Sequence, residues 1–244
     1  MSVYEPGELI YEGKAKKLFS IPGQPDLLFQ EYKDSLTAFN AQKKGSFEEK
    51  GALNREICAL LFDELERNSV LTHRIQEIPP NAIVTRKLKM VKLELVVRNI
   101  LAGSTAKKFG FEEGTPLDAP LVEFYYKDDA LADPFVSDEQ AIMLKTARDR
   151  AELDALRAFG LKINAVLVPY LLKAGIRLID FKVEVGYDKD GVLRLADEIS
   201  PDTCRLWDAK TGEKMDKDRF RRDLGGIAEA YRGVRDRLRQ AGGK

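Results

Sequence analysis

Carboxylates and a lysine recur at strand spacing in the last third of the chain. Residues 178–185 alternate between apolar and charged side chains, which predicts a strand with one apolar and one charged face. The charged face carries Asp180, Lys182 and Glu184. After a short turn, a second strand-like run ends on Asp197 and Glu198. Because Mg²⁺ usually takes one or two protein carboxylates plus phosphate oxygens, Glu184 and Asp197 could share a metal site. An exposed hairpin of mixed charge is the alternative.

The length of the turn between the two strands decides which carboxylate lies beside Glu184. A two-residue turn at 189–190 would put Asp197 on the face of Glu184. A three-residue turn that includes Gly191 would shift the register by one and put Glu198 there instead, unless a bulge compensates. We predict that Glu184 and Asp197 share one metal site.

A basic turn near the N-terminus is a second candidate for phosphate binding. Residues 9–21 read as two short strands joined by a turn that contains Gly13, Lys14 and Lys16. Backbone amides near a glycine, together with lysines that reach inward, can hold nucleotide phosphates. The turn is neither a Walker loop nor a G-x-G-x-x-G motif, and an ordinary solvated turn is the alternative.

A strand followed by a helix start supplies a third group of polar residues. On the predicted strand 93–100, Glu94 and Arg98 share one face. Ser104 follows as a good N-cap for a helical run, and the free amides of a helix start favour a phosphate. A capped helix beside a salt-bridged arginine would explain the same residues.

The spacing of apolar residues predicts the elements that support these groups. Further strands are expected at 27–32, 82–88 and 121–126, and helices at 52–67, 149–173 and 217–240. Pro169 should bend or break the second of these helices. We place a hinge between two lobes near residues 86–92.

Composition limits the classes of partner. The chain has 244 residues, with 40 Lys plus Arg and 40 Asp plus Glu, so no global field favours nucleic acid or a membrane surface. Cys58 and Cys204 suggest neither a disulfide framework nor a zinc site, and His73 has no partner for triad chemistry. No apolar run approaches the length of a membrane span and the N-terminus lacks a signal-peptide core, so we expect a cytoplasmic protein.

The charged residues sort into two chemical groups. The first, which suits a metal-bound triphosphate, comprises Lys14, Lys16, Glu184 and Asp197. The second group comprises Arg98, Ser104 and Arg205. It suits a phosphate monoester, because arginine binds phosphate through bidentate hydrogen bonds. No histidine is positioned to activate a serine or cysteine, so catalysis by positioning and charge stabilisation is the more economical interpretation.

Four motifs are specific enough to compare with a known family. They are G-K-A-K at 13–16, V-V-R-N-I-L-A-G-S at 96–104, L-I-D-F-K-x-E at 178–184 and D-E-I-S-P-D-T-C-R-L-W-D at 197–208. Together they resemble the SAICAR synthetase family, the phosphoribosylaminoimidazole-succinocarboxamide synthases. Shorter similarities are T-A-F-N at 37–40 and D-K-D-R-F-R at 216–221, so the resemblance covers nearly the whole chain.

The resemblance implies an α+β fold of two lobes, with mainly antiparallel sheets, flanking helices and an ATP cleft between the lobes. Residues 1–86 would form an N-terminal β-rich lobe with the nucleotide loop, and residues 87–244 a larger α+β lobe with the metal and ribotide sites. The implied enzyme uses Mg²⁺ and converts ATP, L-aspartate and carboxyaminoimidazole ribotide to the succinocarboxamide, ADP and phosphate. Bacterial members are usually homodimers.

The resemblance also implies roles for individual residues, carried over by position. An ATP site is implied for Lys14, Lys16, Lys87 and Lys127, and Mg²⁺ ligation for Glu184 and Asp197. The ribotide site is implied for Glu94, Arg98, Ser104 and Arg205. Asp180 and Lys182 would stand at the reacting groups, in catalytic or supporting roles, and no residue is assigned to the aspartate pocket.

Two other classes of protein compete with this interpretation. A kinase-like phosphotransferase would also need a basic turn, a hinge and a carboxylate pair, but the H-R-D-x-x-x-x-N and D-F-G motifs are absent. Asp180 and Phe181 are followed by lysine rather than glycine. A non-catalytic nucleotide-binding module would need neither the ribotide group nor the metal carboxylates. Aspartate-dependent release of ADP separates the three classes.

Overall fold

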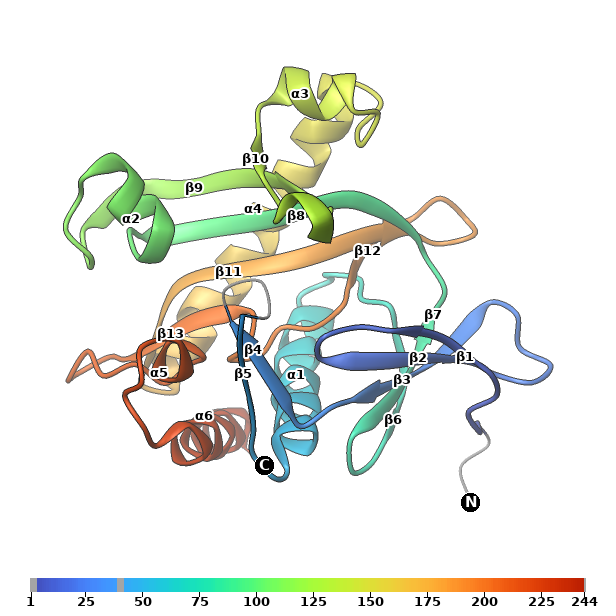
Figure 1. Ribbon diagram of the computed structural model, residues 1–244, viewed down its shortest axis with the longest axis horizontal. Coiled ribbons are helices and arrows are strands. Elements are labelled where there is room, and N and C mark those ends of the chain that lie inside the picture. Colours follow the sequence, from blue (N-terminus) through green and yellow to red (C-terminus); the bar gives the residue numbers. More distant parts are fainter. Residues whose placement is uncertain (1–3, 39–41, 244) are drawn as a thin grey trace.

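Two antiparallel sheets organise the chain, as the computed structural model of residues 4–38 and 42–243 shows (Figure 1). The first sheet has five strands in the order β1 (Leu9–Glu12), β2 (Lys16–Ser20), β3 (Leu27–Tyr32), β7 (Ala82–Arg86) and β6 (Arg74–Ile78). A separate hairpin pairs β4 (Ser35–Ala38) with β5 (Lys43–Ser46). These strands therefore all come from the first 86 residues.

The second sheet has six strands and provides most of the polar residues singled out above. Its order is β10 (Phe135–Val136), β9 (Pro116–Tyr126), β8 (Lys89–Ile100), β11 (Ile176–Tyr187) and β12 (Leu193–Ala196), with β13 (Cys204–Asp208) also paired to β11. All of these pairs are antiparallel. Strand β11 thus lies at the centre, with β8 on one side and β12 and β13 following one another on the other.

Helices flank the sheets, which confirms the predicted α+β class. The longer helices are α1 (Lys50–Arg67), α4 (Arg150–Lys173) and α6 (Ile227–Gly242). The shorter ones are α2 (Gly103–Phe109), the 3₁₀ turn η1 (Asp129–Leu131), α3 (Asp138–Met143) and α5 (Asp218–Arg221). Helix α4 crosses behind the six-stranded sheet, and α1 and α6 lie below it (Figure 1).

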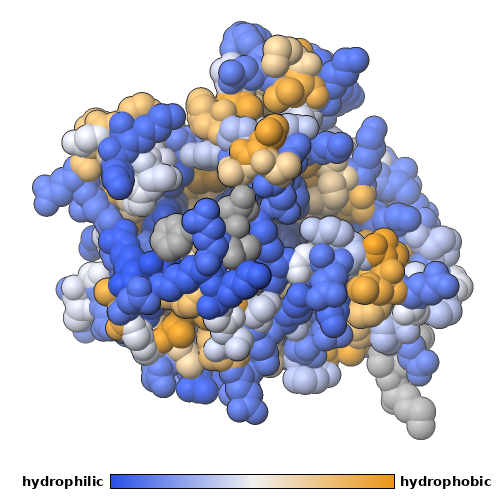
Figure 2. Space-filling model, in the orientation of Figure 1, coloured by the Kyte–Doolittle hydropathy of each residue, from blue (hydrophilic) through white to orange (hydrophobic). Residues whose placement is uncertain are grey.

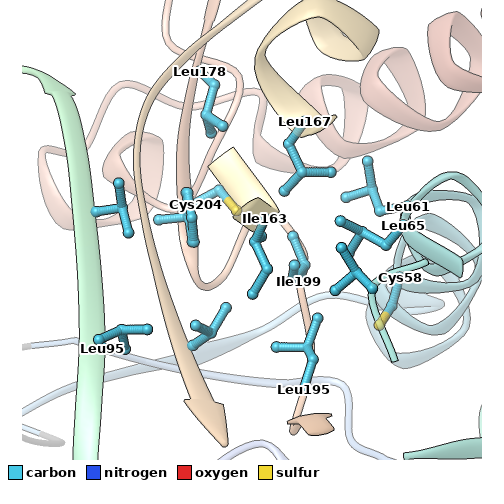
Figure 3. Close-up of a cluster of buried hydrophobic side chains, with 14 of the residues drawn as sticks. Cys58, Leu61, Leu65, Leu95, Ile163, Leu167, Leu178, Leu195, Ile199 and Cys204 are labelled. Carbon is cyan, nitrogen blue, oxygen red and sulfur yellow. The ribbon is translucent and has the colours of Figure 1, made fainter. Parts of the chain in front are cut away.

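The main hydrophobic core lies between α4 and the six-stranded sheet, and α1 contributes to it. In Figure 3, Ile163 and Leu167 of α4 lie between Leu178 of β11 on one side and Leu61 and Leu65 of α1 on the other. These side chains are almost completely buried. Although α1 belongs to the N-terminal third of the chain, its buried face therefore packs in the core of the larger sheet. A second, smaller cluster beneath the five-stranded sheet contains Ile21, Phe29, Ala82 and Val84.

One helix in the described part of the chain, α4, is long and apolar enough to cross a membrane by length and composition. Our sequence analysis expected no such segment. Its buried residues include Leu156, Ile163 and Leu167 of the main core, which is the pattern of a core helix. Apolar residues also lie on its exposed side, notably Leu161 and Leu172, and these raise its mean hydropathy.

Four local predictions were wrong. The helix predicted at 217–240 is interrupted, because Gly225 and Gly226 adopt positive φ angles and separate α5 from α6. Strand β8 begins at Lys89, four residues before the start of the strand predicted at 93–100. Ser104 is not an N-cap, since α2 begins one residue earlier and is preceded by Ala102. Pro169 does not end α4, which continues to Lys173.

Candidate active site

Three adjacent strands bring two arginines to one aspartate. In the register of the six-stranded sheet, Asp180 of β11 lies opposite Arg98 of β8 on one side and Arg205 of β13 on the other. Nη1 of Arg98 and Nη1 of Arg205 each donate to Oδ2 of Asp180 at 2.8 Å. The alternation of β11 explains this placement from Asp180 onward, because Phe181, Val183 and Val185 are buried in the main core. Ile179 is buried in a separate cluster with Ala102 and Trp207, where the pairing of β11 with β13 shifts its register.

Further carboxylates hold each arginine in place. Nε of Arg98 donates to Glu123 at 2.6 Å, and Nε of Arg205 donates to Asp218 at 3.1 Å. Burial alone would lower the pKa of Arg98, but Asp180 and Glu123 outweigh it and raise the pKa. Asp180 and Asp218 likewise raise the pKa of Arg205 against the effect of burial. Both guanidinium groups are therefore permanently charged and oriented before any ligand arrives.

The start of α2 lies directly against Arg205. Gly103 has a φ of +62°, and a Cβ at this position would lie 2.3 Å from Nη2 of Arg205. Only glycine permits both the backbone angle and this close approach. Ser104 follows at the edge of the same cavity, so the helix start and the two arginines are adjacent.

A cavity of about 200 Å³ joins these groups. Six of the residues singled out in the sequence line it, namely Glu94, Arg98, Ser104, Asp180, Lys182 and Arg205. Sequence reasoning missed four other polar residues in its lining, which are Tyr125, Asp202, Thr203 and Arg221. The alternation of the strand at 121–126 placed Glu123 and Tyr125 on one face, but only the pairing of β9 with β8 shows that this face meets Arg98.

Lysine–carboxylate pairs continue along β11 beyond Asp180. Nζ of Lys182 lies 2.5 Å from Oε1 of Glu94, and Lys127 pairs with Glu184. Burial tends to lower the pKa of Lys182, but Glu94, Glu184 and Asp197 together outweigh it and raise the pKa. The face of β11 therefore presents, in order, an aspartate held by arginines, a lysine held by a glutamate and a glutamate held by a lysine.

The turn between β11 and β12 adopts the three-residue alternative. Asp188 N donates to Val192 O at 3.0 Å, and Glu184 lies opposite Ala196. In a regular strand this register would turn Asp197 away from Glu184. Strand β12 instead ends at Ala196, and Asp197 adopts a left-handed φ of +57° that redirects the chain.

Asp197 consequently lies in the same charge cluster as Glu184. It pairs with Lys16 of β2, whose Nζ is also 2.9 Å from Oε1 of Glu198. Burial and the charge of Asp197 raise the pKa of Glu184, whereas Lys16 lowers the pKa of Asp197 despite its burial. Lys127 interacts electrostatically with both carboxylates. The five-stranded sheet therefore contributes a lysine directly to carboxylates of the larger sheet.

The donor chemistry of this cluster fits a hard divalent cation. No group of three or more histidine, cysteine or acidic side chains forms a metal site within the described residues. Two carboxylates are nevertheless what Mg²⁺ needs when phosphate oxygens and water complete its shell. The lysines that neutralise Glu184 and Asp197 are cations that a phosphate-bound metal ion could replace.

The other two lysines predicted for the ATP site, Lys14 and Lys87, are both exposed. Nζ of Lys14 lies 2.7 Å from Oδ1 of Asp129, and both side chains are exposed. Lys87 is exposed in the connector between β7 and β8 and forms no ion pair among the described residues; its backbone N donates to Asp26 O at 2.8 Å. Phe39 and Asn40 of the T-A-F-N motif lie outside the described residues.

The face drawn in Figure 2 is largely hydrophilic, with apolar groups over α3 and near β1.

The geometry first defines a class of protein. An α+β fold with a pre-oriented arginine pair at one end of a charged strand and carboxylates at the other is suited to a phosphate-bearing small molecule. The family is then given by comparison with known proteins. The family model described as SAICAR synthetase matches residues 9–238, and the chain belongs to that family.

Individual relatives agree with this assignment. The phosphoribosylaminoimidazole-succinocarboxamide synthase of Campylobacter fetus is 52% identical over 231 residues, which is 95% of this chain and 98% of the relative. A crystal structure of the same synthase from Ehrlichia chaffeensis has a TM-score of 0.91 at 41% identity, covering 95% of this chain and 98% of that one. A structure described as SAICAR synthetase in complex with ADP has a TM-score of 0.90 at 45% identity and covers 95% and 97%.

Proposed function

We propose that this protein is an ATP-dependent ligase of purine biosynthesis. It would join L-aspartate to the carboxylate of 5-amino-1-(5-phosphoribosyl)imidazole-4-carboxylate, the ribotide, and release ADP and phosphate. Family membership supports this function, since relatives that cover nearly the whole chain are synthases of this name. A relative bound to ADP supports a nucleotide co-substrate.

The ordered row of charged residues on β11 supports the proposal independently of family membership. Asp180 and Glu184 are four residues apart, and a strand rises about 3.3 Å per residue, so the two ends of the row lie roughly 13 Å apart. The ribotide has a phosphate at one end and a carboxylate at the other. Lying along β11, it would place its phosphate at the arginine pair and its carboxylate near Lys182 and the metal carboxylates.

The phosphate of the ribotide would be bound by Arg98, Ser104 and Arg205. Both arginines now share one oxygen of Asp180, so each keeps guanidinium N–H groups for a ligand. A phosphate between them would form bidentate, charge-assisted hydrogen bonds. Asp180 would then hold the two arginines at the correct separation, which is a positioning role.

The nucleotide would lie between the two sheets, where Lys16 reaches Asp197. Its phosphates would be met by Lys14, Lys16, Lys87 and Lys127. Glu184 and Asp197 would hold Mg²⁺, which when bound neutralises phosphate charge. Lys16 and Lys127, released from these carboxylates, would turn toward the phosphate oxygens. Residues 1–86 and 87–244 would accordingly act as the two lobes on either side of the nucleotide.

The reaction must turn a carboxylate oxygen into a leaving group, because a carboxylate resists attack by an amine. An oxygen of the ribotide carboxylate would attack the γ-phosphorus, and the bond from that phosphorus to ADP would break. The amine of aspartate would then form the new C–N bond, lose a proton, and displace phosphate together with that oxygen. Lys182, oriented by Glu94, would stabilise the negative charge on the acyl oxygen.

An isotope experiment tests this chemistry. With ¹⁸O in the ribotide carboxylate, we expect one labelled oxygen in inorganic phosphate and ADP as the nucleotide product. Label in AMP would show adenylation, and unlabelled phosphate would show hydrolysis of ATP without activation of the carboxylate. Either result would overturn the acyl-phosphate route.

A second assay tests the class of activity itself. ADP release should require both L-aspartate and the ribotide. Phosphoryl transfer without aspartate would favour a kinase, and nucleotide binding without release of ADP would favour a binding module.

We also propose a cytoplasmic homodimer. The exposed apolar residues Leu161 and Leu172 of α4 support association of two copies, since burial of such side chains is favourable. Sedimentation equilibrium should give about twice the 27.5 kDa mass of the chain. A monomer at micromolar concentration would refute this arrangement.

A further inference from the structure

Glu198 directly follows the candidate metal ligand Asp197 and shares a lysine with it. Nζ of Lys16 lies 2.9 Å from Oε1 of Glu198 and also pairs with Asp197. The side chain of Asp197 is 27% exposed, whereas that of Glu198 is 3% exposed. Asp197 is therefore accessible to an ion from solution and Glu198 is not.

The backbone after Asp197 carries Glu198 into the protein interior. Asp197 adopts a left-handed φ of +57°, and the three residues that follow it are all buried. The second of these, Ile199, belongs to the main hydrophobic core. A buried carboxylate costs free energy unless a cation and hydrogen bonds compensate its charge. The fold can therefore keep Glu198 ionised at this position only with a cationic partner.

Lys16 is that partner, and it forms the one ion pair that Glu198 has among the residues that the structure describes. Oε2 of Glu198 is buried and has no hydrogen-bond partner among them. Lys16 lies opposite Tyr32 in the pairing of β2 with β3, and its Nζ is 5.3 Å from the centre of the Tyr32 ring. An aromatic ring attracts a cation above its face. The buried ring and the buried carboxylate therefore attract the same ammonium group.

The other lysine of the same turn makes a different kind of contact with the larger lobe. Lys14 pairs with Asp129, and these side chains are 41% and 67% exposed. An exposed ion pair contributes little, because water competes for both charges. The side chain of Lys16 is 10% exposed, so its pair with Glu198 is a buried charge contact between the two sheets.

Lys16 would lose one of its two carboxylates in the proposed nucleotide complex, because Asp197 would then hold Mg²⁺. Glu198 is buried behind Asp197 and would stay with Lys16. A lysine ammonium has three N–H donors, so one can remain on Glu198 while another faces a phosphate oxygen. Glu198 would then keep the cation at the edge of the nucleotide site.

We propose that Glu198 is a positioning residue of the nucleotide site, which holds the ammonium of Lys16 in place when Asp197 binds the metal ion. This inference rests on the proposed function, which supplies the nucleotide. Glu198 acts through Lys16 and contacts neither phosphate nor metal, so it is not a catalytic residue. Without its charge, Lys16 would pair with Asp197 alone and would compete there with the metal ion.

Calorimetric titration of the protein with ATP at fixed Mg²⁺ concentration, without ribotide or aspartate, tests this role. Glu198→Gln keeps the size of the side chain and removes its charge. We expect the affinity for ATP to fall about tenfold or more, because a hydrogen bond between charged groups is weakened. Glu229→Gln is the matched control at an exposed position of α6, and its affinity should lie within about twofold of wild type.

A double-mutant cycle distinguishes a role through Lys16 from general damage. Lys16→Met should lower the affinity for ATP, and adding Glu198→Gln should lower it no further, because the group through which Glu198 acts is gone. Lys16→Met also leaves a buried carboxylate without its cation. We therefore expect the double variant to melt at a higher temperature than Lys16→Met. This comparison tests the pair even if Glu198→Gln alone does not fold.

Three results would overturn the proposal. An unchanged or increased affinity for ATP in Glu198→Gln would exclude the positioning role. Additive losses of affinity in the cycle would make the role of Glu198 structural. A double variant that melts no higher than Lys16→Met would show that Lys16 does not compensate the buried carboxylate. A wild-type protein that fails to bind ATP would instead refute the proposed nucleotide site itself, before any variant is compared.

Discussion

Gly103 and Arg205 form the closest fit in the candidate site. The guanidinium of Arg205 lies where a side chain at position 103 would begin, with 2.3 Å between Nη2 and an added Cβ. The backbone at Gly103 is also left-handed, with a φ of +62°. The orientation of this arginine therefore depends on a glycine that precedes the helix residue Ser104.

A Gly103→Ala substitution should displace Arg205 and weaken use of the ribotide. We expect kcat/KM for the ribotide to fall about tenfold to a hundredfold, because a small misplacement of a binding group has effects of this size. Gly110→Ala is the matched control, since Gly110 has a φ of +71° but open space around it. Both variants carry the same backbone strain of about 1 kcal/mol. Similar kinetics for the two variants would contradict the role given to the contact.

Replacing Arg205 by lysine should separate its binding role from its structural one. Lysine keeps the charge but cannot reach Asp180, Asp218 and a phosphate with one planar fork. We expect a loss of about 1.5–3 kcal/mol in kcat/KM for the ribotide, with the KM for ATP nearly unchanged. Equal losses for both substrates would indicate that Arg205 only holds the fold.

Glu184→Gln should raise the Mg²⁺ requirement. An amide is a weaker ligand for Mg²⁺ than a carboxylate, so the half-saturating Mg²⁺ concentration should increase about tenfold or more at fixed ATP. Asp154→Asn removes an exposed carboxylate of α4 and serves as the control. If the Mg²⁺ dependence of activity is identical in the three proteins, Glu184 is not a ligand.

Asp216 should make stability depend on pH. Burial, followed by the nearby charge of Asp218, raises the pKa of Asp216 from 3.8 to about 7. The folded state therefore binds this proton more tightly than the unfolded state does. The stabilising contribution is complete below the unfolded pKa and is lost as pH rises through 7.

The measurement is the difference in free energy of unfolding between wild type and Asp216→Asn. This difference should shift in favour of the variant as pH rises from about 4 to 7, since all other groups titrate in both proteins. Both oxygens of Asp216 accept backbone N–H groups, from Leu206 at 2.8 Å and Asp218 at 2.7 Å, so the variant is expected to be less stable at low pH. A difference that is constant with pH would show that Asp216 does not titrate in this range.

Local patterns in the sequence predicted a large part of the fold and of the site. The alternation correctly separates the buried Phe181, Val183 and Val185 from the charged row on β11, whereas Ile179 lies in a separate buried cluster at a register shift between β11 and β13. The helices predicted at 52–67 and 149–173 are also found, as α1 (Lys50–Arg67) and α4 (Arg150–Lys173). Such features depend on residues within a few positions of one another, so a single sequence contains the necessary information.

Features that depend on distant segments could not be read in this way. Strand β13 was not predicted, although it carries Arg205, because five residues after a turn have no period that separates a strand from a loop. The break at Gly225 was missed for the opposite reason, since the apolar spacing on both sides continues without interruption. Glu123 and Asp218 had no visible role until their partners were known.

The sequence by itself determined which residues carry the charges and which face of β11 they share, because side-chain direction alternates with a period of two. Only the tertiary structure decided that Arg98 and Arg205 meet at Asp180, because Arg98 is 82 positions and Arg205 is 25 positions from Asp180 in the chain, on two strands that each pair with β11. It also decided that Asp197 joins Glu184, through a left-handed residue at the end of β12 that the strand pattern did not contain. Strand pairing and a single backbone angle are both set by packing across the whole molecule, and together they bring these charged residues into one site.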